Sequence, residues 1–435
     1  MINLIIFLFI LGLLVVVHEF GHFIIAKRMG VRVEKFSLGL GKQLFSKQKG
    51  DTQYCINAIP LGGYVKLAGD NSEDFKGNAD EYLSQPPGKR AAIIVFGPLL
   101  NYVLGFLFFW LICFVGYPSF TTKVGGLVDG FGAKESGIQI GDRIVAVDGQ
   151  GIALWEDLQN IIKAKKAETI VRLSVLRNER ESTIEVKIKE EQISDLLGQK
   201  HSVGLLGITR GDEFIKVRHG FLKSFSLGIN KTVELTTLTY KALWRMIIGK
   251  LAMRETVTGP LGMFYITSKA ASLGVIAVLH LMAVLSVSLA IFNLLPLPVL
   301  DGGHLFFLAI EKLRGKALSL KTELIVTRIG FTLLISLAIL VTYNDILRVF
   351  QDRASPKPDT EISLAQSEIE ELNSKISSLS EQNSALKDSN EKLKIELNQI
   401  SQEKDRLTQE RDALRSQFNP SVGPKKAIKI GVTDK

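Results

Sequence analysis

The chain has 435 residues, 46% of them hydrophobic, and its mean hydropathy is positive, as in membrane proteins with water-soluble parts. Its two cysteines exclude a disulfide scaffold of more than one bridge. The net charge of +9 does not predict nucleic-acid binding, because basic residues cluster in the loops after the first apolar segment and between the third and fourth, where they orient membrane spans.

The first apolar segment, residues 4–26, is long enough to cross a bilayer, which takes about 17–25 residues as a helix. It contains the motif H-E-F-G-H, in which His18 and His22 share one helix face and Glu19 points to the flank of that face. Titratable groups at membrane depth are costly, so they predict a functional site. The spacing is typical of a zinc site in which the glutamate takes a proton from water.

Three further apolar segments, residues 91–116, 273–295 and 324–343, complete four predicted spans. The first segment lacks the basic start and the small-residue cleavage site of a signal peptide, so we expect it to be retained. Basic residues cluster after the first span and between the third and fourth, which places both loops in the cytoplasm. The segment between spans two and three and the C-terminus then face the outside, and the histidine motif lies towards the cytoplasmic end of its span.

Residues 36–66, in the first cytoplasmic loop, alternate and turn like a β-hairpin. An exposed strand edge of such a hairpin can bind an extended peptide segment by adding it as a strand. The alternative is a cytoplasmic hairpin with no role in substrate binding.

The pattern of residues 123–210 predicts an α+β domain of the PDZ type. Residues 141–149 alternate as a strand that ends in a turn, and residues 155–163 form an amphipathic helix. Such a domain binds a peptide end, filters substrates by size, or serves as a spacer. Residues 211–258 predict an amphipathic helix at the outer membrane interface, and the alternative is a soluble helix packed on the PDZ domain.

An open zinc site needs a third protein ligand. The best candidate is Asp301, in the stretch N-L-L-P-L-P-V-L-D-G-G-H of residues 293–304. Its two prolines end the third span, and its two glycines allow an unusual turn. An aspartate at membrane depth needs a cavity or a partner. A solvated aspartate in a cytoplasmic turn is the alternative, and His304 is a rival ligand.

After the last span, residues 351–361 predict a linker, residues 362–418 a coiled coil, and residues 419–435 a basic tail. The coil is predicted because apolar residues recur every seven positions: Leu372, Leu379, Leu386, Leu393, Ile400, Leu407 and Leu414. We expect a parallel homodimer whose register is fixed by Asn383 and Asn390. A coil with a different partner chain and a single solvated helix are the alternatives.

The histidine and aspartate motifs together resemble the site-2 proteases, which are zinc intramembrane proteases, and the order of the parts is similar to their bacterial branch of the regulator of sigma-E protease type. The resemblance covers residues 1–350 and includes G-P-L-L-N at 97–101 and G-P-L-G at 259–262. It implies that two histidines and one aspartate bind Zn²⁺, namely His18, His22 and Asp301. It also implies that Glu19 is the general base.

The same resemblance implies a substrate-binding role for Asn293, through the substrate backbone or the developing oxyanion, and we extend that role to Asn101. For Asn293, a purely structural hydrogen bond between helices is the alternative. The resemblance also implies that the predicted hairpin dips towards the active site.

These features predict a polytopic α-helical membrane protein with four transmembrane helices in residues 1–122 and 259–350, one extracytoplasmic PDZ domain and a C-terminal coiled coil. The implied function is a zinc endopeptidase of the bacterial inner membrane. It would cut transmembrane segments of single-pass proteins already trimmed by another protease, such as anti-sigma factors, or leftover signal peptides. A non-catalytic scaffold and a zinc transporter are the alternatives. The intact Glu19 argues against a scaffold, since structural zinc needs no base, and a transporter needs more intramembrane ligands.

Overall fold

The computed structural model describes residues 2–71, 73–165, 168–194, 198–252, 257–316, 319–354 and 390–416. The chain divides into two units, Met1–Val349 and Phe350–Lys435. In the second unit, residues 390–416 form one helix whose side chains are almost all exposed. The predicted coiled coil requires such a helix, but its pairing stays a prediction. The rest of that coil, most of the predicted linker and the basic tail lie outside the described residues.

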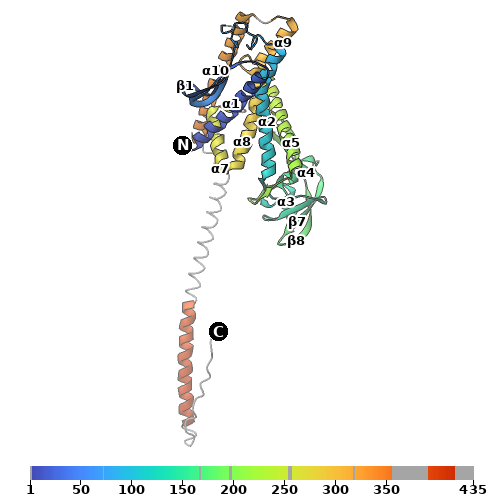
Figure 1. The fold of residues 1–435 in the computed structure, drawn as a ribbon. Helices are drawn as coiled ribbons and strands as arrows, with labels where there is room; N and C mark the ends of the chain where they lie inside the picture. Colours follow the sequence, from blue (N-terminus) through green and yellow to red (C-terminus); the bar gives the residue numbers. More distant parts are fainter. Residues whose placement is uncertain are drawn as a thin grey trace. The chain divides into compact units, whose positions relative to one another are not determined.

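Four helices of the described residues are long and apolar enough to cross a membrane, which confirms the four predicted spans (Figure 1). They are α1 (Ile2–Arg28), α2 (Pro87–Val115), α8 (Val275–Asn293) and the Leu324–Leu347 stretch of α10 (Leu320–Ala354). The local sequence explains their ends. α1 ends with two basic residues, Lys27 and Arg28, whose positive charge is favourable at the negative end of the helix dipole. α2 begins with a proline, which lacks only an N–H that the first turn leaves unpaired.

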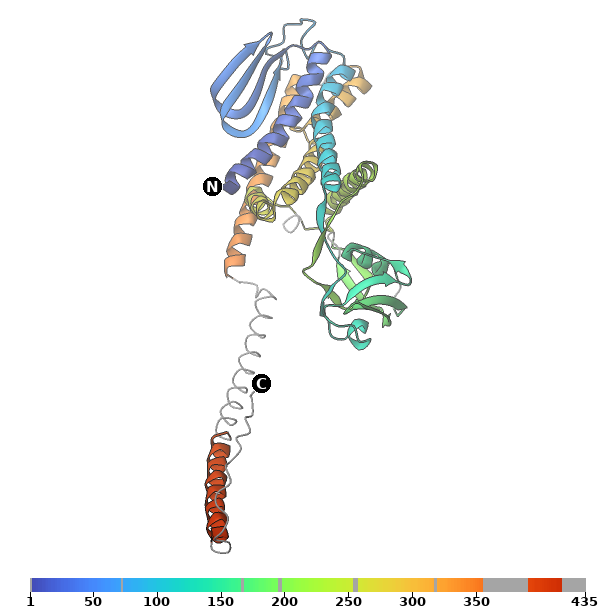
Figure 2. The same ribbon diagram turned by 60° about the horizontal axis from the view of Figure 1, so that its bottom comes forward.

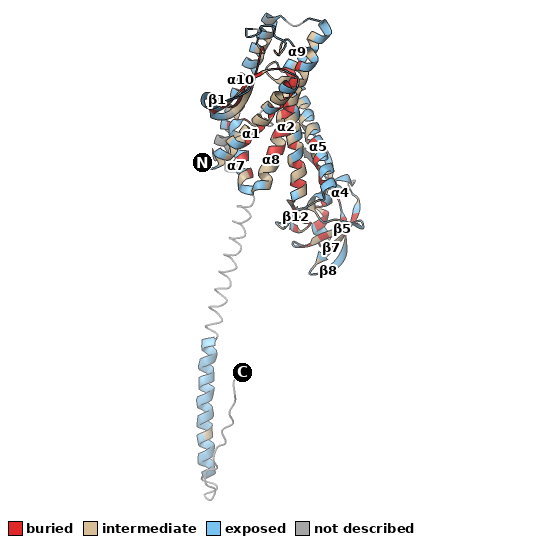
Figure 3. Ribbon diagram, in the orientation of Figure 1, coloured by how far each residue is buried: buried red, intermediate tan, exposed pale blue. Residues whose placement is uncertain are grey.

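Glycines bring α1, α2 and α8 into close contact, and buried residues line the faces that these helices share (Figure 3). A Cβ added at Gly105 of α2 would lie 2.5 Å from the Val287 side chain of α8. A Cβ added at Gly21 of α1 would lie 2.3 Å from the Phe96 carbonyl oxygen of α2. In a lipid bilayer the hydrophobic effect does not drive helices together, so close packing and hydrogen bonds between helices hold them in contact. The three helices therefore form the core that carries the histidine motif.

Three more helices border this core: α5 (Phe221–Ile247), α7 (Pro260–Leu273) and α9 (Asp301–Arg314). α5 is amphipathic, as predicted, and its buried residues are small: Ser224, Gly228 and Thr232. A Cβ added at Gly228 would lie 3.0 Å from the backbone nitrogen of Trp110 on α2. The hydroxyls of Tyr102 on α2 and Thr236 on α5 are hydrogen-bonded at 3.0 Å. α5 therefore packs along the second span, and its place relative to the membrane surface stays a prediction.

Two carboxylates fix the remaining helices. Glu311 of α9 forms an ion pair with Arg90 of α2, and both side chains are mostly buried. Asp345 of α10 is 3% exposed and accepts hydrogen bonds from the backbone N–H groups of Gly259, at 3.2 Å, and Gly262, at 2.9 Å. The last span is thereby attached to the start of α7.

The loop between the first two spans holds an antiparallel hairpin of two strands, β1 (Val33–Lys49) and β2 (Thr52–Leu67). Both strands are long and bend back on themselves, so that Ser37 pairs with Cys55 and also with Tyr64. The second half of β2 thereby runs beside α1. A Cβ added at Gly63 would lie 3.6 Å from Cγ of Glu19. The hairpin therefore reaches the histidine motif.

Between α2 and α5 lies an α+β unit (Figure 2). Its strands are β3 (Tyr117–Phe120), β4 (Val124–Leu127), β5 (Arg143–Val147), β6 (Gln150–Gly151), β7 (Ile170–Arg177), β8 (Arg180–Lys187), β9 (Lys189–Ser194), β10 (Lys200–Leu205), β11 (Ile208–Arg210) and β12 (Phe214–Val217). Its helices are α3 (Gly132–Glu135) and α4 (Trp155–Ala164). The order β6-β5-β7-β8 makes its largest sheet, and β12 pairs with β3 where the chain enters and leaves. One apolar core that includes Val124, Ile144, Leu158 and Leu173 holds the unit together.

A buried carboxylate stabilises this unit. Asp142 is 2% exposed, and its two oxygens accept hydrogen bonds from the Arg177 guanidinium at 2.7 Å. The guanidinium holds the pKa of the Asp142 carboxyl below its usual value. A folded-state pKa below the unfolded value of about 3.9 gives stability that is present at neutral pH and is lost as the pH falls through the folded-state pKa.

We therefore expect Asp142→Asn to lower the unfolding free energy of the α+β unit at pH 7 by roughly 1.5–3 kcal/mol, the range for hydrogen bonds to charged groups. The fluorescence of Trp155 during denaturant unfolding, in a background without the other two tryptophans, measures this. Asp129→Asn is the matched control, because the Asp129–Lys134 ion pair is exposed and exposed pairs contribute little. Equal effects of the two substitutions would contradict the assignment.

Candidate metal centre

The structure brings the three predicted ligands together. His18 and His22 lie one turn apart on α1, and Asp301 is the first residue of α9. His18 Nε2 is 3.0 Å from Asp301 Oδ2 and 3.1 Å from His22 Nε2, and His22 Nε2 is 3.6 Å from the same oxygen. Residues almost 280 positions apart in the chain thus present their donor atoms to one point.

These three atoms fit a zinc ion. Bonds of about 2.0–2.1 Å to a tetrahedral ion place neighbouring donors roughly 3.3 Å apart, which matches the observed separations of 3.0–3.6 Å. Two imidazoles and one carboxylate are also a ligand set found in catalytic zinc sites. Three electron-rich atoms at such distances repel one another unless a cation or protons lie between them.

The ring of His22 is held from behind by α2. Its Nδ1 lies 2.9 Å from the Ile93 carbonyl oxygen, to which Nδ1–H donates, and this leaves Nε2 free for a metal. The front of the ring rests on Gly97, where an added Cβ would lie 2.3 Å from Nε2. The helix crossing therefore leaves no room for any side chain at position 97.

We expect Gly97→Ala to displace the His22 ring and to weaken zinc binding by more than about 10-fold. Moving a ligand lowers metal affinity more than changing the hydrogen-bond partner behind that ligand does. Zinc affinity of the purified protein in detergent, measured by competition with a chelating dye, tests this. Gly88→Ala on the same helix is the control, since an added Cβ there meets no atom of the described residues within 4 Å. Unchanged affinity in Gly97→Ala would contradict the described packing.

Two asparagines approach the other side of His18. The side-chain nitrogens of Asn101 on α2 and of Asn293, the last residue of α8, each lie 3.5 Å from His18 Nδ1. Asn101 is fully buried, at 0% exposure, whereas Asn293 is half-buried. The two residues predicted to bind substrate therefore differ in access.

Asp301 is placed by a tight turn after the third span. The Gly303 N–H donates to the Leu300 carbonyl at 2.9 Å. A Cβ added at Gly302 would lie 2.3 Å from the Leu294 carbonyl oxygen, and one at Gly303 would lie 2.1 Å from that of Leu297. The two glycines let α9 begin directly against the chain that precedes it, which turns Asp301 towards α1.

Glu19 lies beside the donor cluster rather than in it. The three groups that hold the potential metal position are His18, His22 and Asp301. Glu19 is half-buried and lies against the hairpin, where a Cβ added at Gly63 would be 3.6 Å from its Cγ. A carboxylate next to the ligands, but separate from them, is available to accept a proton.

Two cavities meet at this cluster, and both are lined in part by Glu19, His22 and Asp301. One, of about 390 Å³, is completed by side chains from α1, α8 and the turn: Val15, His18, Leu289, Asn293, Val299 and Leu300. The other, of about 660 Å³, extends between the hairpin, α2 and α9, past Arg90 and Glu311. The rival ligand His304 lines this second cavity and is not part of the donor cluster.

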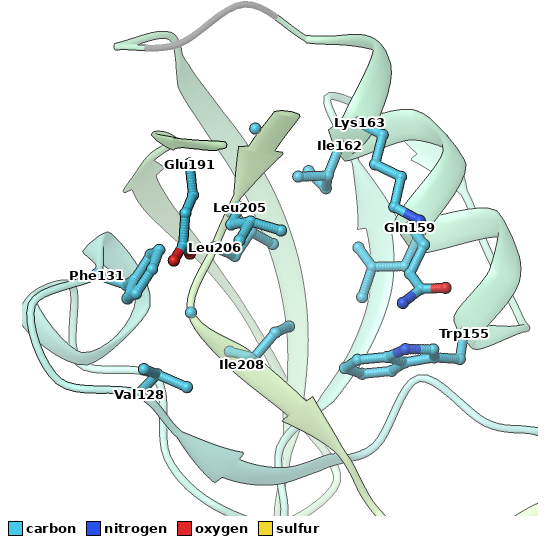
Figure 4. Close-up of a pocket in the computed structure, with 13 residues that line it drawn as sticks. Val128, Phe131, Trp155, Gln159, Ile162, Lys163, Glu191, Leu205, Leu206 and Ile208 are labelled. Carbon is cyan, nitrogen blue, oxygen red and sulfur yellow. The ribbon is translucent and has the colours of Figure 1, made fainter. Parts of the chain in front are cut away.

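The α+β unit has a groove of its own, of about 270 Å³ (Figure 4). Trp155, Gln159 and Lys163 of α4 form one wall, facing Leu205 and Ile208. The groove lies between a helix and the end of a strand, and its lining is mostly apolar. An extended peptide fits such a space.

Two features that shape the site cannot be recognised from the sequence alone: the Ile93 carbonyl behind His22 and the need for glycine where α1 and α2 cross. The Ile93 carbonyl is a main-chain group, so no residue type marks it. Gly97 is the first residue of the G-P-L-L-N motif, and Gly21 lies inside the H-E-F-G-H motif. Neither motif by itself indicates that glycine is needed for helix packing. The demand for glycine at both positions becomes evident only when α1 and α2 cross.

Comparisons with known proteins agree with this geometry. The model of peptidase family M50 matches residues 6–337. The chain is 28% identical to a zinc metalloprotease RasP of Oceanobacillus iheyensis, and the match covers 79% of this chain and 98% of the relative. It is 27% identical to a regulator of sigma E protease of Haemophilus influenzae, and this match also covers 79% of this chain and 98% of the relative.

Among solved structures, the PDZ domain of an SdrC-like protein from Listeria innocua matches 21% of this chain and 96% of its own, at 20% identity and a TM-score of 0.17. The family match covers well over half of the chain and both motifs that supply the donor cluster. The chain therefore belongs to peptidase family M50, the site-2 protease family, and is a zinc metalloprotease built on membrane-spanning helices.

Proposed function

We propose that this protease cleaves peptide bonds inside the membrane-spanning segments of single-pass proteins. The observation that carries the proposal is the place of the donor cluster. Two of its three members lie in α1, a helix apolar enough to cross a membrane. In the cavity beside them, Val15, Leu289 and Leu300 form an apolar part next to the polar groups of the donor cluster. A site with these surroundings suits an apolar substrate segment, because burying it there costs little desolvation.

In this proposal His18, His22 and Asp301 hold the zinc. When bound, zinc supplies Lewis-acid chemistry: it polarises a carbonyl group and makes water a stronger acid. Glu19, which flanks the ligands, accepts the proton of the attacking water. It then gives that proton to the amide nitrogen that leaves, so that one residue serves as base and then as acid.

The hairpin and Asn293 position the substrate. A helix hides its peptide bonds, so the segment that is cut must be extended. The second half of β2 pairs with β1 on one side and approaches α1 at Gly63, beside Glu19. A substrate added along this part of β2 would present its backbone to the base. Asn293 lines the same cavity, where its amide can donate to the substrate carbonyl.

Substrate trapping tests the proposal. Full-length Glu19→Gln protein in cells should retain uncleaved substrates, which photocrosslinking from a probe at Leu289 captures for identification by mass spectrometry. We expect single-pass membrane proteins whose outer part is already short, such as trimmed anti-sigma factors or leftover signal peptides. Capture of soluble proteins alone would overturn the proposal.

We also propose a location in the bacterial inner membrane, with the hairpin and the α9–α10 loop in the cytoplasm and the α+β unit and C-terminus outside. The basic loops support this orientation. Labelling of cysteines introduced at Lys47 and at Asp129 with a membrane-impermeant reagent tests it. In intact spheroplasts, the cysteine at 129 should react and the one at 47 should not, and the reverse would contradict the orientation.

The α+β unit, which we take to be a PDZ domain, selects substrates in this proposal. Deleting residues 123–210 should leave cleavage of an already trimmed substrate within a few-fold of normal and allow cleavage of the untrimmed one, if the domain is a filter. Cleavage of both substrates by the purified variants measures this. Loss of cleavage of both would contradict the filter and favour recruitment through the groove in Figure 4.

Residues 362–418 complete the proposal as a parallel dimeric coiled coil that joins two copies of the protease. Within the described part, Leu393, Leu407 and Leu414 are exposed, as unpaired core positions of one strand would be. Analytical ultracentrifugation of the 356–420 peptide tests this, since a monomer at every concentration would contradict self-association.

A further inference from the structure

Asn101 is an enclosed polar residue beside the donor cluster. Its side chain is fully buried, its Oδ1 atom has no hydrogen-bond partner within the described residues, and it lines neither cavity at the site. Its backbone carbonyl accepts a hydrogen bond from the Ser286 hydroxyl of α8 at 2.7 Å, which fixes the residue between two spans. Burying an amide oxygen without a hydrogen-bond donor is destabilising, so a role should account for it.

The side-chain nitrogen of Asn101 lies 3.5 Å from His18 Nδ1. His18 Nε2 faces Asp301 and His22 and must carry no proton when it binds a metal. The hydrogen of the neutral ring then sits on Nδ1, which becomes a donor and needs an acceptor. An amide that turns its NH₂ group to Nδ1 would instead favour the ring form that has a proton on Nε2, and this form cannot bind the ion.

The oxygen and nitrogen of a carboxamide occupy equivalent positions and exchange when the group turns by 180°. One orientation of Asn101 therefore suits a ring without metal, and the other presents Oδ1 to the Nδ1–H of a metal-binding ring. Outer partners that accept from the second ring nitrogen fix the ring form and orientation of metal-binding histidines generally.

Two asparagines compete for this role, but only one acceptor is needed. Asn293 is equally close to His18 Nδ1, yet it is half-buried and lines the cavity proposed for substrate. Asn101 is enclosed and anchored by Ser286, so it cannot reach a substrate without movement of α2. Asn101 is therefore suited to contact the ligand His18, and Asn293 is suited to contact the substrate.

We propose that Asn101 is a positioning residue for the metal site: its amide oxygen accepts the Nδ1–H of His18 and holds that ring in the metal-binding form, while Asn293 faces the substrate. This assignment differs from the sequence-based prediction that both asparagines contact substrate. It rests on the proposed role of His18 as a zinc ligand.

Zinc affinity of the full-length protein in detergent, measured by competition with a chelating dye, separates the two roles without a substrate. Asn101→Leu keeps the approximate shape but removes the acceptor, and it should weaken zinc binding about 10- to 100-fold, the usual cost of losing an outer partner. Asn101→Asp offers only acceptor oxygens and should retain affinity within a few-fold of the native protein. Asn293→Leu should retain zinc affinity and lose cleavage.

Two further measurements guard against a merely structural effect. Ser286→Ala removes the anchor of the Asn101 backbone but no partner of His18, so it reports on helix packing alone. The visible absorption of the cobalt-substituted protein should change in Asn101→Leu and not in Ser286→Ala, because it reports on the ligand geometry.

Native zinc affinity in Asn101→Leu, or equal losses in Asn101→Leu and Asn101→Asp, would overturn the inference. Failure of the native protein to bind zinc would instead refute the ligand assignment on which the inference rests. Zinc binding without cleavage of any membrane segment would leave the inference standing and refute the proposed function.

Discussion

Glu19→Gln should abolish cleavage while zinc stays bound. The amide keeps the size of the side chain but cannot accept a proton, and general acid–base catalysis of this kind is worth about 10²- to 10⁴-fold in rate. Zinc should remain because Glu19 lies outside the cluster of His18, His22 and Asp301. Metal analysis and the cleavage rate of a model transmembrane substrate, both on the purified variant, measure the two effects.

Glu34→Gln is the matched control for this variant. It makes the same chemical change on the neighbouring hairpin. Glu34 forms an ion pair there with Lys66, and the Lys66 side chain is more than a third exposed. We expect native rates from it, since such pairs contribute little. Native turnover in Glu19→Gln would end the assignment of the base, and loss of zinc would show that Glu19 acts as a ligand instead.

Asp301→Asn should release the metal. The substitution keeps the shape of the side chain but removes the charge that attracts the ion, and the Oδ2 atom lies 3.0 Å from Nε2 of His18 at the point where the donors converge. We expect zinc affinity to fall by more than about 100-fold, beyond the effect of changing an outer partner. Cleavage should fall with it and return in part at high zinc concentration.

His304→Ala is the informative comparison. His304 is three residues further along α9 and was a rival ligand by sequence, but in the structure it lines the cavity between the hairpin and α9. Zinc affinity in His304→Ala should equal that of the native protein. If His304→Ala loses zinc and Asp301→Asn keeps it, the third ligand has been assigned to the wrong residue.

The parts of this protein that follow from local sequence were predictable. The four spans are long apolar runs, and the structure has helices at each of them. His18 and His22 are a fixed distance apart on any helix, so their pairing needed no tertiary information. The motif around Asp301 marked a broken span, and α8 does end at Asn293, before the two prolines.

Features that depend on two distant segments were not predictable in the same way. Residues 36–66 alternate as a hairpin does, but the double pairing of Ser37 with Cys55 and Tyr64 requires both strands to bend. The small residues of α5 suit a helix contact, yet nothing in their spacing names α2 as the partner. The different surroundings of Asn101 and Asn293 likewise arise from the crossing of α2 and α8.

The most direct test of the central claim is to locate the bond that is cut. The native protein, loaded with zinc and reconstituted in liposomes with a trimmed single-pass substrate, should yield two fragments whose ends mass spectrometry can place. We predict a cut within the apolar segment of the substrate, abolished by a zinc chelator and restored by added zinc. A cut only in the water-exposed flanks, or one that persists with the chelator present, would contradict a zinc protease that works within the membrane.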